Sequence, residues 1–487
     1  MASSGPPGGR SFTQPTLSAG LDPGSFRDRH SRVYLSGTRV LRGLSSEALA
    51  AWHLLGSSGL LEALTSTGRL VATRELGSGE IPPALREAGW QGVLDHQRIP
   101  FVSYPYEWSF EMLRDAALLQ LDVLRESLAR GLTMKDATPY NVQLVGAAPV
   151  FIDVGSFGPY PSGESWLGYR QFCELFLNPL LLHAYRGAPL RQLLRGRLDG
   201  IPPADCLAAL SWRDRLRPGV LTHVLLHAKA EARVSSECNV TAPLAAAGFD
   251  KEMILNNLRG LSRVIRGLRP KDGKSLWVNY QEDNSYETAD RHLKIEVVRR
   301  EAAKVAGGLV WDLGANTGEY SRVAAEHATY VVAMDSDAAC VDRLYLELKG
   351  ESERRILPLV VDLADPSPGL GWRCAERAPL WDRGRPDLVL ALALVHHLAI
   401  GANVPVPEII SWFAALGAGR LLVEYVAKDD AMTRRLLANK QDQYADYEQA
   451  AFEESLERHF VVEEKVALPR GTRWLYACRS RDAQARA

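Results

Sequence analysis

The segment VWDLGANTGEY (310–320) places one acid and two glycines at a spacing suited to ligand binding. It follows an apolar, strand-like run and precedes a helix-like one, which is the setting in which a turn brings its backbone close to a ligand. The dinucleotide pattern G-x-G-x-x-G fails, because Asn316 and Glu319 stand at its second and third glycine positions. Asp312, two residues before Gly314, would repel a pyrophosphate but would attract a cationic group such as an amine. The turn therefore predicts a ligand with a cationic end.

Two further acids end the strand-like runs that follow this turn. Asp335 closes VVAMD about 20 residues after the first glycine, where an acid can bind both hydroxyls of a ribose. Asp362 closes the next apolar run, LVVD. Parallel strands present their carboxyl ends at one edge of a sheet, and ligands of open α/β sheets bind there. We expect both acids and the glycine turn to meet at that edge.

The elements that must position these residues alternate between apolar strands and amphipathic helices from about residue 308 to 426. This alternation predicts a parallel, doubly wound sheet. We expect a buried strand within 388–400, and a closing antiparallel hairpin from FVVEEKVAL and GTRWLYACR. A lead-in helix within 276–301 is expected over the mouth of the site.

The turn and the two acids resemble the cofactor motifs of the class I S-adenosylmethionine-dependent methyltransferases, over roughly 280–480. Asn316 departs from the family's middle glycine, although a small polar residue tolerates an unusual backbone. The resemblance implies a Rossmann-like domain over 276–480, with Asp335 on the ribose and Asp362 near the adenine. The residues that it implies for binding S-adenosylmethionine are Asp312, Gly314, Ala315, Asn316, Gly318, Asp335 and Asp362.

The chemistry of such a cofactor needs little from the protein beyond alignment and the exclusion of water, because the methyl group is already activated. An oxygen or nitrogen acceptor also benefits from a general base. His396, first of the pair in LVHHL, is our catalytic candidate, with Glu424 a weaker one at the same edge. A structural role for the histidines stays open. Tyr280 and Tyr286 could pack on the sulfonium or simply against the sheet.

A second constellation lies in the N-terminal half, where Asp136 precedes Asn141 by five residues and Asp153 follows twelve later. The segments KDATPYN and FIDVGSF that contain them resemble the catalytic loop and metal-binding aspartate of kinase-like phosphotransferases, closest to the aminoglycoside-phosphotransferase branch. We expect a long helix at 110–131, two short strands between Asn141 and Asp153, and further helices over 165–266. The resemblance implies an α+β kinase-like domain over 26–268.

Several features expected of an active kinase are missing from this half. No glycine-rich phosphate loop occurs in the first hundred residues, and a strand lysine paired with a helix glutamate is not identifiable; only Arg42 with Glu47 stands in a comparable place. Lys135 occupies the position before Asp136 where small-molecule kinases commonly have glycine. The pattern favours a degenerate domain used for substrate recognition or as a scaffold.

Most of the chain also resembles the NoeA-like nodulation methyltransferases of bacteria, through PYEWSFEMLRDAALLQL, KDATPYNVQL and PVFIDVGSF. This implies methyl transfer to a small molecule or a glycan. Two alternatives stay open. One is a bifunctional phosphotransferase and methyltransferase, and the other is a cofactor-binding scaffold without turnover.

Composition limits the remaining possibilities. The 487 residues are 46% hydrophobic and 24% charged, and the net charge of −1 gives no case for a nucleic-acid or membrane-surface partner. Six scattered cysteines without a CxxC pair indicate neither a disulfide framework nor a metal site. We expect tails at 1–25 and 481–487, a cytoplasmic protein and no membrane span. The oligomeric state is not predicted.

Overall fold

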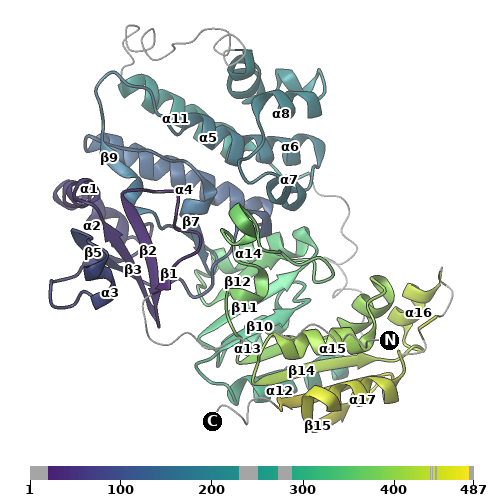
Figure 1. The fold of residues 1–487 in the computed structure, drawn as a ribbon. Helices are drawn as coiled ribbons and strands as arrows, with labels where there is room; N and C mark the ends of the chain where they lie inside the picture. Colours follow the sequence, from purple (N-terminus) through teal and green to yellow (C-terminus); the bar gives the residue numbers. More distant parts are fainter. Residues whose placement is uncertain are drawn as a thin grey trace, which may run out of the picture.

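The computed structural model describes residues 20–229, 251–271, 288–438, 440, 443–444 and 447–481. Each half has a sheet of its own (Figure 1). No helix in these ranges is long and apolar enough to cross a membrane. The segment 272–287 between the halves, with Tyr280 and Tyr286, lies outside the described residues.

The N-terminal half begins with a five-stranded antiparallel sheet in the order β1-β2-β3-β5-β4. Its strands are β1 (Gly20–Leu21), β2 (Ser31–Ser36), β3 (Arg39–Leu44), β4 (Thr73–Glu75) and β5 (Gly92–His96). Helices α1 (Ser46–Ser57) and α2 (Leu60–Thr65) lie between β3 and β4, and α3 (Pro83–Glu87) precedes β5. The sheet begins earlier than expected. Strand β1 lies inside the segment predicted as a tail up to residue 25, and it pairs with β2.

A helical layer completes this half and is built around the predicted long helix. Helix α4 spans Phe110–Ala129, and Gly131 follows it with φ of +76°, a conformation that suits glycine. The short strands β6 (Leu132–Met134) and β9 (Phe157–Pro159) pair, and β7 (Val142–Val145) forms the expected hairpin with β8 (Ala148–Phe151). The helices that follow are α5 (Tyr169–Phe172), α6 (Asn178–Arg186), α7 (Leu190–Gly196), α8 (Pro203–Ala209) and α11 (Lys251–Gly267).

The C-terminal half is a seven-stranded sheet in the order β12-β11-β10-β13-β14-β16-β15. All of its pairings are parallel except those of β16, which runs antiparallel to both neighbours. The strands are β10 (Leu309–Leu313), β11 (Tyr330–Asp335), β12 (Ile356–Val360), β13 (Leu388–Ala391), β14 (Arg420–Val426), β15 (Phe460–Ala467) and β16 (Arg473–Ser480). The fourth strand is shorter than the predicted 388–400, because the chain turns at Leu392–Val395 and continues as a turn of π-helix, His397–Gly401.

Helices on both faces of this sheet confirm the doubly wound arrangement. They are α12 (Thr288–Ala303), α13 (Glu319–Ala325), α14 (Ala338–Gly350), α15 (Val406–Ala415), α16 (Ala431–Leu437) and α17 (Gln449–His459). Strands β10 to β14 are buried almost throughout, as parallel strands covered on both faces must be. Helix α12 is the described part of the expected lead-in.

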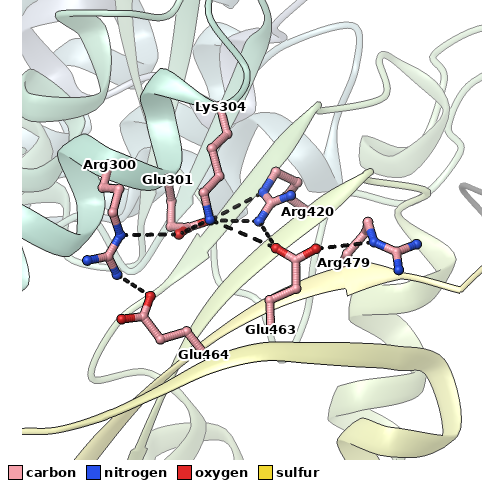
Figure 2. Close-up of polar contacts among 7 residues, drawn as sticks. All are labelled: Arg300, Glu301, Lys304, Arg420, Glu463, Glu464 and Arg479. Carbon is pink, nitrogen blue, oxygen red and sulfur yellow. Dashed lines mark hydrogen bonds and ion pairs between the residues drawn. The ribbon is translucent and has the colours of Figure 1, made fainter.

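Hydrogen bonds and ion pairs between charged side chains link α12 to the antiparallel edge of the sheet (Figure 2). The buried Glu301 accepts hydrogen bonds from Arg420 of β14 at 3.0 Å and from Lys304 at 2.7 Å. Glu463 of β15 bonds both Arg420 and Arg479, and Glu464 pairs with Arg300. This network holds α12 in place, and α12 contributes residues to the lining of the candidate site.

The two halves share one hydrophobic core, and buried polar contacts join them. The Arg383 guanidinium donates to the Glu107 carboxylate at 2.7 Å, with side chains 2% and 1% exposed. The ring of Tyr104 lies 4.8 Å from that guanidinium, and its hydroxyl accepts from the Ala378 N–H at 2.9 Å. Helix α4 packs on α14, where the Tyr345 hydroxyl donates to an Asp115 oxygen at 2.7 Å. Such an interface predicts halves that hold a fixed relative position.

Candidate functional site

A cavity of about 460 Å³ opens at the carboxyl ends of β10, β11, β12 and β13. Of the residues implied for cofactor binding, Gly314, Ala315, Asn316, Asp335 and Asp362 line it. His396, the catalytic candidate, lines it as well. The structure therefore brings together at one sheet edge residues that lie up to 82 positions apart in the sequence.

The turn after β10 takes the backbone conformation that its sequence allows. Gly314 and Gly318 have φ of +79°, and Asn316 has φ of +50°, in the left-handed region that asparagine tolerates better than other non-glycine residues. A Cβ on Gly314 would contact Leu394 at 3.4 Å, and one on Gly318 would lie 2.6 Å from Leu344. Gly314 leaves room at the cavity, whereas Gly318 leaves room for the packing of α14. Asn316 in place of the family's middle glycine thus preserves the turn.

Asp335 is held at the cavity by two backbone groups. One carboxylate oxygen accepts from the Asn316 N–H and the other from the Asp337 N–H, both at 2.8 Å. Each oxygen keeps a further lone pair for a ligand hydroxyl. Burial raises the pKa of this carboxyl above its ordinary value.

Asp312 does not reach the cavity, contrary to the expectation that it meets a cationic ligand end directly. Its side chain is 2% exposed and accepts a hydrogen bond from the Ser321 hydroxyl of α13 at 2.6 Å. It therefore ties β10 to the helix that follows the turn. Burial raises its pKa to about 6.

This burial predicts a pH dependence of stability. The ordinary pKa of 3.8 rises to about 6 on folding, so the folded state binds the proton more tightly and loses stability as the pH rises through that interval. At 1.36 kcal/mol per pH unit, Asp312→Asn should gain about 2–3 kcal/mol relative to the wild type between pH 4 and pH 7. Urea unfolding at several pH values measures this, and a difference independent of pH would contradict it.

Charged residues of α12 and β16, among them Lys294 and Arg473, also line the cavity, and sequence reasoning missed them. Glu424, the weaker catalytic candidate, contacts both but does not line the cavity itself. Glu424, fully buried at the end of β14, pairs with Lys294 of α12 at 2.8 Å and lies 3.5 Å from Arg473 of β16. It also accepts from the Ala393 N–H at 2.9 Å, where φ is +49°. A lone acid in the apolar run RLLVEYV marked Glu424, but its partners come from distant elements. The carboxylate holds the loop after β13 in its unusual conformation.

His396 is 1% exposed, and its Nδ1 has no hydrogen-bond partner among the described residues. Burial, followed by the neighbouring His397, lowers its pKa well below the ordinary value. The two imidazole centroids lie 4.2 Å apart. The ring is therefore neutral near pH 7, so one of its two nitrogens carries a proton and the other can accept a hydrogen bond.

The kinase-like constellation forms a separate cluster in the N-terminal half. The Asn141 amide lies 3.4 Å from an Asp153 oxygen, and Asp136 sits beside them at the end of β6. Arg42 of β3 donates to the other Asp153 oxygen at 3.0 Å and to the Ser31 hydroxyl at 3.2 Å. Glu47 does not join Arg42, since it pairs with His30. None of these residues lines the cavity.

The C-terminal sheet and site define a class I S-adenosylmethionine-dependent methyltransferase domain. In order of appearance its strands are arranged 3-2-1-4-5-7-6 with the seventh antiparallel, the glycine turn follows the first, and acids follow the second and third. S-adenosylmethionine is the cofactor of this class. No family model matches the chain.

The chain belongs to the family of nodulation protein NoeA. NoeA of Rhizobium meliloti (strain 1021) is 35% identical over 460 residues, which are 93% of this chain and 94% of that protein. Solved structures with some likeness include the N-methyltransferase NodS from Bradyrhizobium japonicum WM9, at 13% identity and a TM-score of 0.30 over 40% of this chain and 98% of NodS. Another is magnesium protoporphyrin IX methyltransferase (ChlM) from Synechocystis PCC 6803 with bound SAM. It is 20% identical, with a TM-score of 0.28 over 43% of this chain and 86% of that protein.

Proposed function

We propose that this chain transfers a methyl group from S-adenosylmethionine to a polar small-molecule or glycan acceptor. The observation that carries the proposal is the Asp335 carboxylate, fixed by two backbone N–H groups at the end of the second strand and facing the cavity. The fit is supported by a volume of about 460 Å³, by the unpartnered Nδ1 of His396 and by the clearance at Gly314.

Each residue takes a role that follows from its place. Asp335 would accept from the ribose hydroxyls, Asp362 from the adenine amino group, and the backbone of Gly314 to Asn316 would lie along the amino-acid part. The cofactor supplies a methyl group already activated by its sulfonium. The chain's own task is to align the acceptor and exclude water. Lys294 and Arg473 contribute charged groups to the cavity lining, which favours a polar acceptor.

His396 would receive the hydrogen bond of the acceptor's hydroxyl or amine. Its low pKa keeps it neutral but makes it a weak base, so it orients the acceptor more than it removes a proton. We expect His396→Ala to lower methyl transfer by about 10- to 100-fold while cofactor affinity changes less than threefold. Incorporation of a labelled methyl group measures the rate of methyl transfer, and calorimetry measures the affinity for the cofactor. An equal loss of affinity would mean that His396 serves the cofactor pocket only.

A direct test of the function uses S-adenosylmethionine labelled in its methyl group. The full chain is incubated with this cofactor and fractionated metabolite or glycan extracts, and labelled products are identified by mass spectrometry. The proposal predicts a product that is absent with the Asp335→Ala variant. Tight cofactor binding without any labelled product would favour a cofactor-binding scaffold instead.

We further propose that the N-terminal half is a kinase-like domain that supports recognition and does not transfer phosphate. Support comes from a five-stranded sheet with helices between β3 and β4, from the β7–β8 hairpin, and from the loops that gather Asp136, Asn141 and Asp153. The Arg42 guanidinium pairs with one oxygen of Asp153. In a kinase the corresponding carboxylate binds the metal.

This pairing leads to a measurable expectation. Titration of magnesium ATP should give no saturable binding that depends on Asp153, so the wild type and Asp153→Asn should give the same titration, because Arg42 already pairs with this carboxylate. Arg42→Met should leave the fold intact and free that carboxylate. Saturable binding by the wild type that disappears in Asp153→Asn would instead support a bifunctional enzyme.

A further inference from the structure

Two arginines of the N-terminal half reach into the loop that follows β12 in the C-terminal half. Arg195 contacts both carboxylate oxygens of Asp365, at 2.7 and 2.9 Å, and Arg191 contacts one of them at 3.0 Å. Arg195 also donates to the Asp365 carbonyl at 3.2 Å, and Arg191 donates to the same carbonyl. The side chain and the backbone of Asp365 are thus held together by two guanidinium groups.

The same loop carries the acid assigned to the adenine. Arg191 lies 3.7 Å from an Asp362 oxygen, and the other Asp362 oxygen accepts from the Ala364 N–H at 3.0 Å. Asp362, Leu363 and Ala364 all line the cavity. A loop of four residues therefore has the cavity on one side and the arginines of α7 on the other.

Helix α7, which carries the two arginines, is packed into the N-terminal half. Leu190 and Leu194 of the same helix are 5% and 1% exposed in the shared core, so one face of α7 is fixed in the N-terminal half. The side chains of Arg191 and Arg195 are only 14% and 21% exposed, whereas freely solvated arginines are far more open. Hydrogen bonds from Arg195 lower the pKa of Asp365. Bidentate arginine–carboxylate contacts are among the more directional in proteins.

We propose that Arg191 and Arg195 position the adenine side of the cofactor site, so that the N-terminal half is part of the cofactor-binding machinery. This rests on the proposed function, and in particular on Asp362 as the acceptor of the adenine amino group. Arg191 and Arg195 are positioning residues, because they act through Asp362 and Asp365 and do not touch the cavity.

The test compares the cofactor's product with an analogue altered at the purine edge that carries the group Asp362 would bind, where N1 also gains a proton. S-adenosylhomocysteine carries the adenine amino group, and S-inosylhomocysteine replaces it with a carbonyl. The full chain is titrated with both by calorimetry, as wild type, as Arg191→Leu with Arg195→Leu, and as Arg197→Leu. Arg197 is the matched control, since it follows α7 directly and, among the residues that the structure describes, forms its ion pair with Asp205 of its own half.

We expect the double variant to bind S-adenosylhomocysteine at least about tenfold more weakly and to lose most of its preference over the inosine analogue, with Arg197→Leu unchanged. Arg191→Lys should restore part of the preference. A double variant that keeps wild-type affinity and preference would overturn the positioning role while leaving the proposed function intact. A wild type that binds neither compound would overturn both. Should the double variant not fold, Asp365→Asn removes the same contact from the other side and must give the same loss.

An independent observation concerns a second cavity, of about 300 Å³, between α4 and α11. Its lining includes four arginines and one acid, namely Arg125, Arg259, Arg263, Arg266 and Asp122, together with Ser262. Asp122 pairs with Arg125 at 3.1 Å. Within the described part of the chain, no acid lies within ion-pair distance of the three arginines of α11.

These three arginines recur at intervals of four and three residues on one stripe of α11, where like charges destabilise a helix. An anion in the cavity would relieve that repulsion, and guanidinium groups suit the paired oxygens of a phosphate. We infer that this cavity binds the phosphate or diphosphate group of a small ligand.

Calorimetry with inorganic pyrophosphate tests this site, with a nucleoside diphosphate as a second arm to separate a phosphate ester from the free anion. We expect saturable binding that weakens at least about tenfold in Arg263→Ala with Arg266→Ala, and does not change in Arg434→Ala with Arg435→Ala, a matched exposed pair on α16. No binding by the wild type, or the same weakening in both variants, would overturn the inference.

Discussion

Replacing Asp335 by alanine is expected to weaken S-adenosylmethionine binding by at least about 100-fold. The variant would lose the two hydrogen bonds that we propose to the ribose, each worth about 1.5–3 kcal/mol when the acceptor is charged. It also leaves the N–H groups of Asn316 and Asp337 without their partner, which loosens the glycine turn. Calorimetric titration of the cofactor into the full chain measures the change.

A neighbouring acid supplies the control for this experiment. Asp337 caps α14 by accepting from the Ala339 N–H at 2.9 Å, and it does not line the cavity. Asp337→Ala should cost about 1 kcal/mol of stability and change cofactor affinity less than threefold. Equal losses of affinity in the two variants would show that the effect comes from the loop's fold, and an unchanged affinity in Asp335→Ala would refute the ribose assignment.

The largest expected effect on stability comes from Glu107→Leu, which removes one partner of the buried pair between the halves. Arg383 would keep its charge at 2% exposure without a carboxylate, a situation that costs about 3–5 kcal/mol. Urea unfolding followed by fluorescence should show this as a lower midpoint. The rings of Tyr104 and Phe101 over the guanidinium offset only part of the loss.

The double variant Glu107→Leu with Arg383→Leu separates the pair from its surroundings. Because an apolar pair needs no charge compensation, we expect it to recover most of the lost stability. If Glu107→Leu alone proved as stable as the wild type, the two halves would not be joined through this contact in solution.

The C-terminal fold was predictable because its signals are local. Strand–helix alternation, the glycine turn and acids at successive strand ends each occupy a few adjacent residues, and the structure confirms the parallel sheet and the closing hairpin. The cavity edge followed from the same pattern, since five of the residues implied for the cofactor line it. The hairpin β7–β8 and the helix α4 were predictable for the same reason.

Side-chain direction and long-range pairing were not predictable. Asp312 stands where the motif places its acid, but only the structure shows that it turns to Ser321 and away from the cavity. Lys294 and Arg191 lie 130 and 171 residues from the acids they meet, Glu424 and Asp362, so no local pattern connects them. The run 388–400 is apolar apart from His396 and His397, and its pattern does not mark the turn that follows Ala391.

The kinase-like character of the N-terminal half stays a prediction. Its loops do bring Asp136, Asn141 and Asp153 together, but the sequence did not predict that Arg42 would pair with Asp153. Glu47, which with Arg42 stands where a kinase has its glutamate and lysine, pairs with His30.

The central claim is that the cofactor chemistry lies in the C-terminal half. One calorimetric comparison on the wild-type chain tests it most directly, with S-adenosylmethionine and magnesium ATP titrated separately under the same conditions. We predict one-to-one binding of S-adenosylmethionine at the C-terminal site, and no magnesium ATP binding that is lost in Asp153→Asn. Binding of magnesium ATP with no response to S-adenosylmethionine would contradict the account.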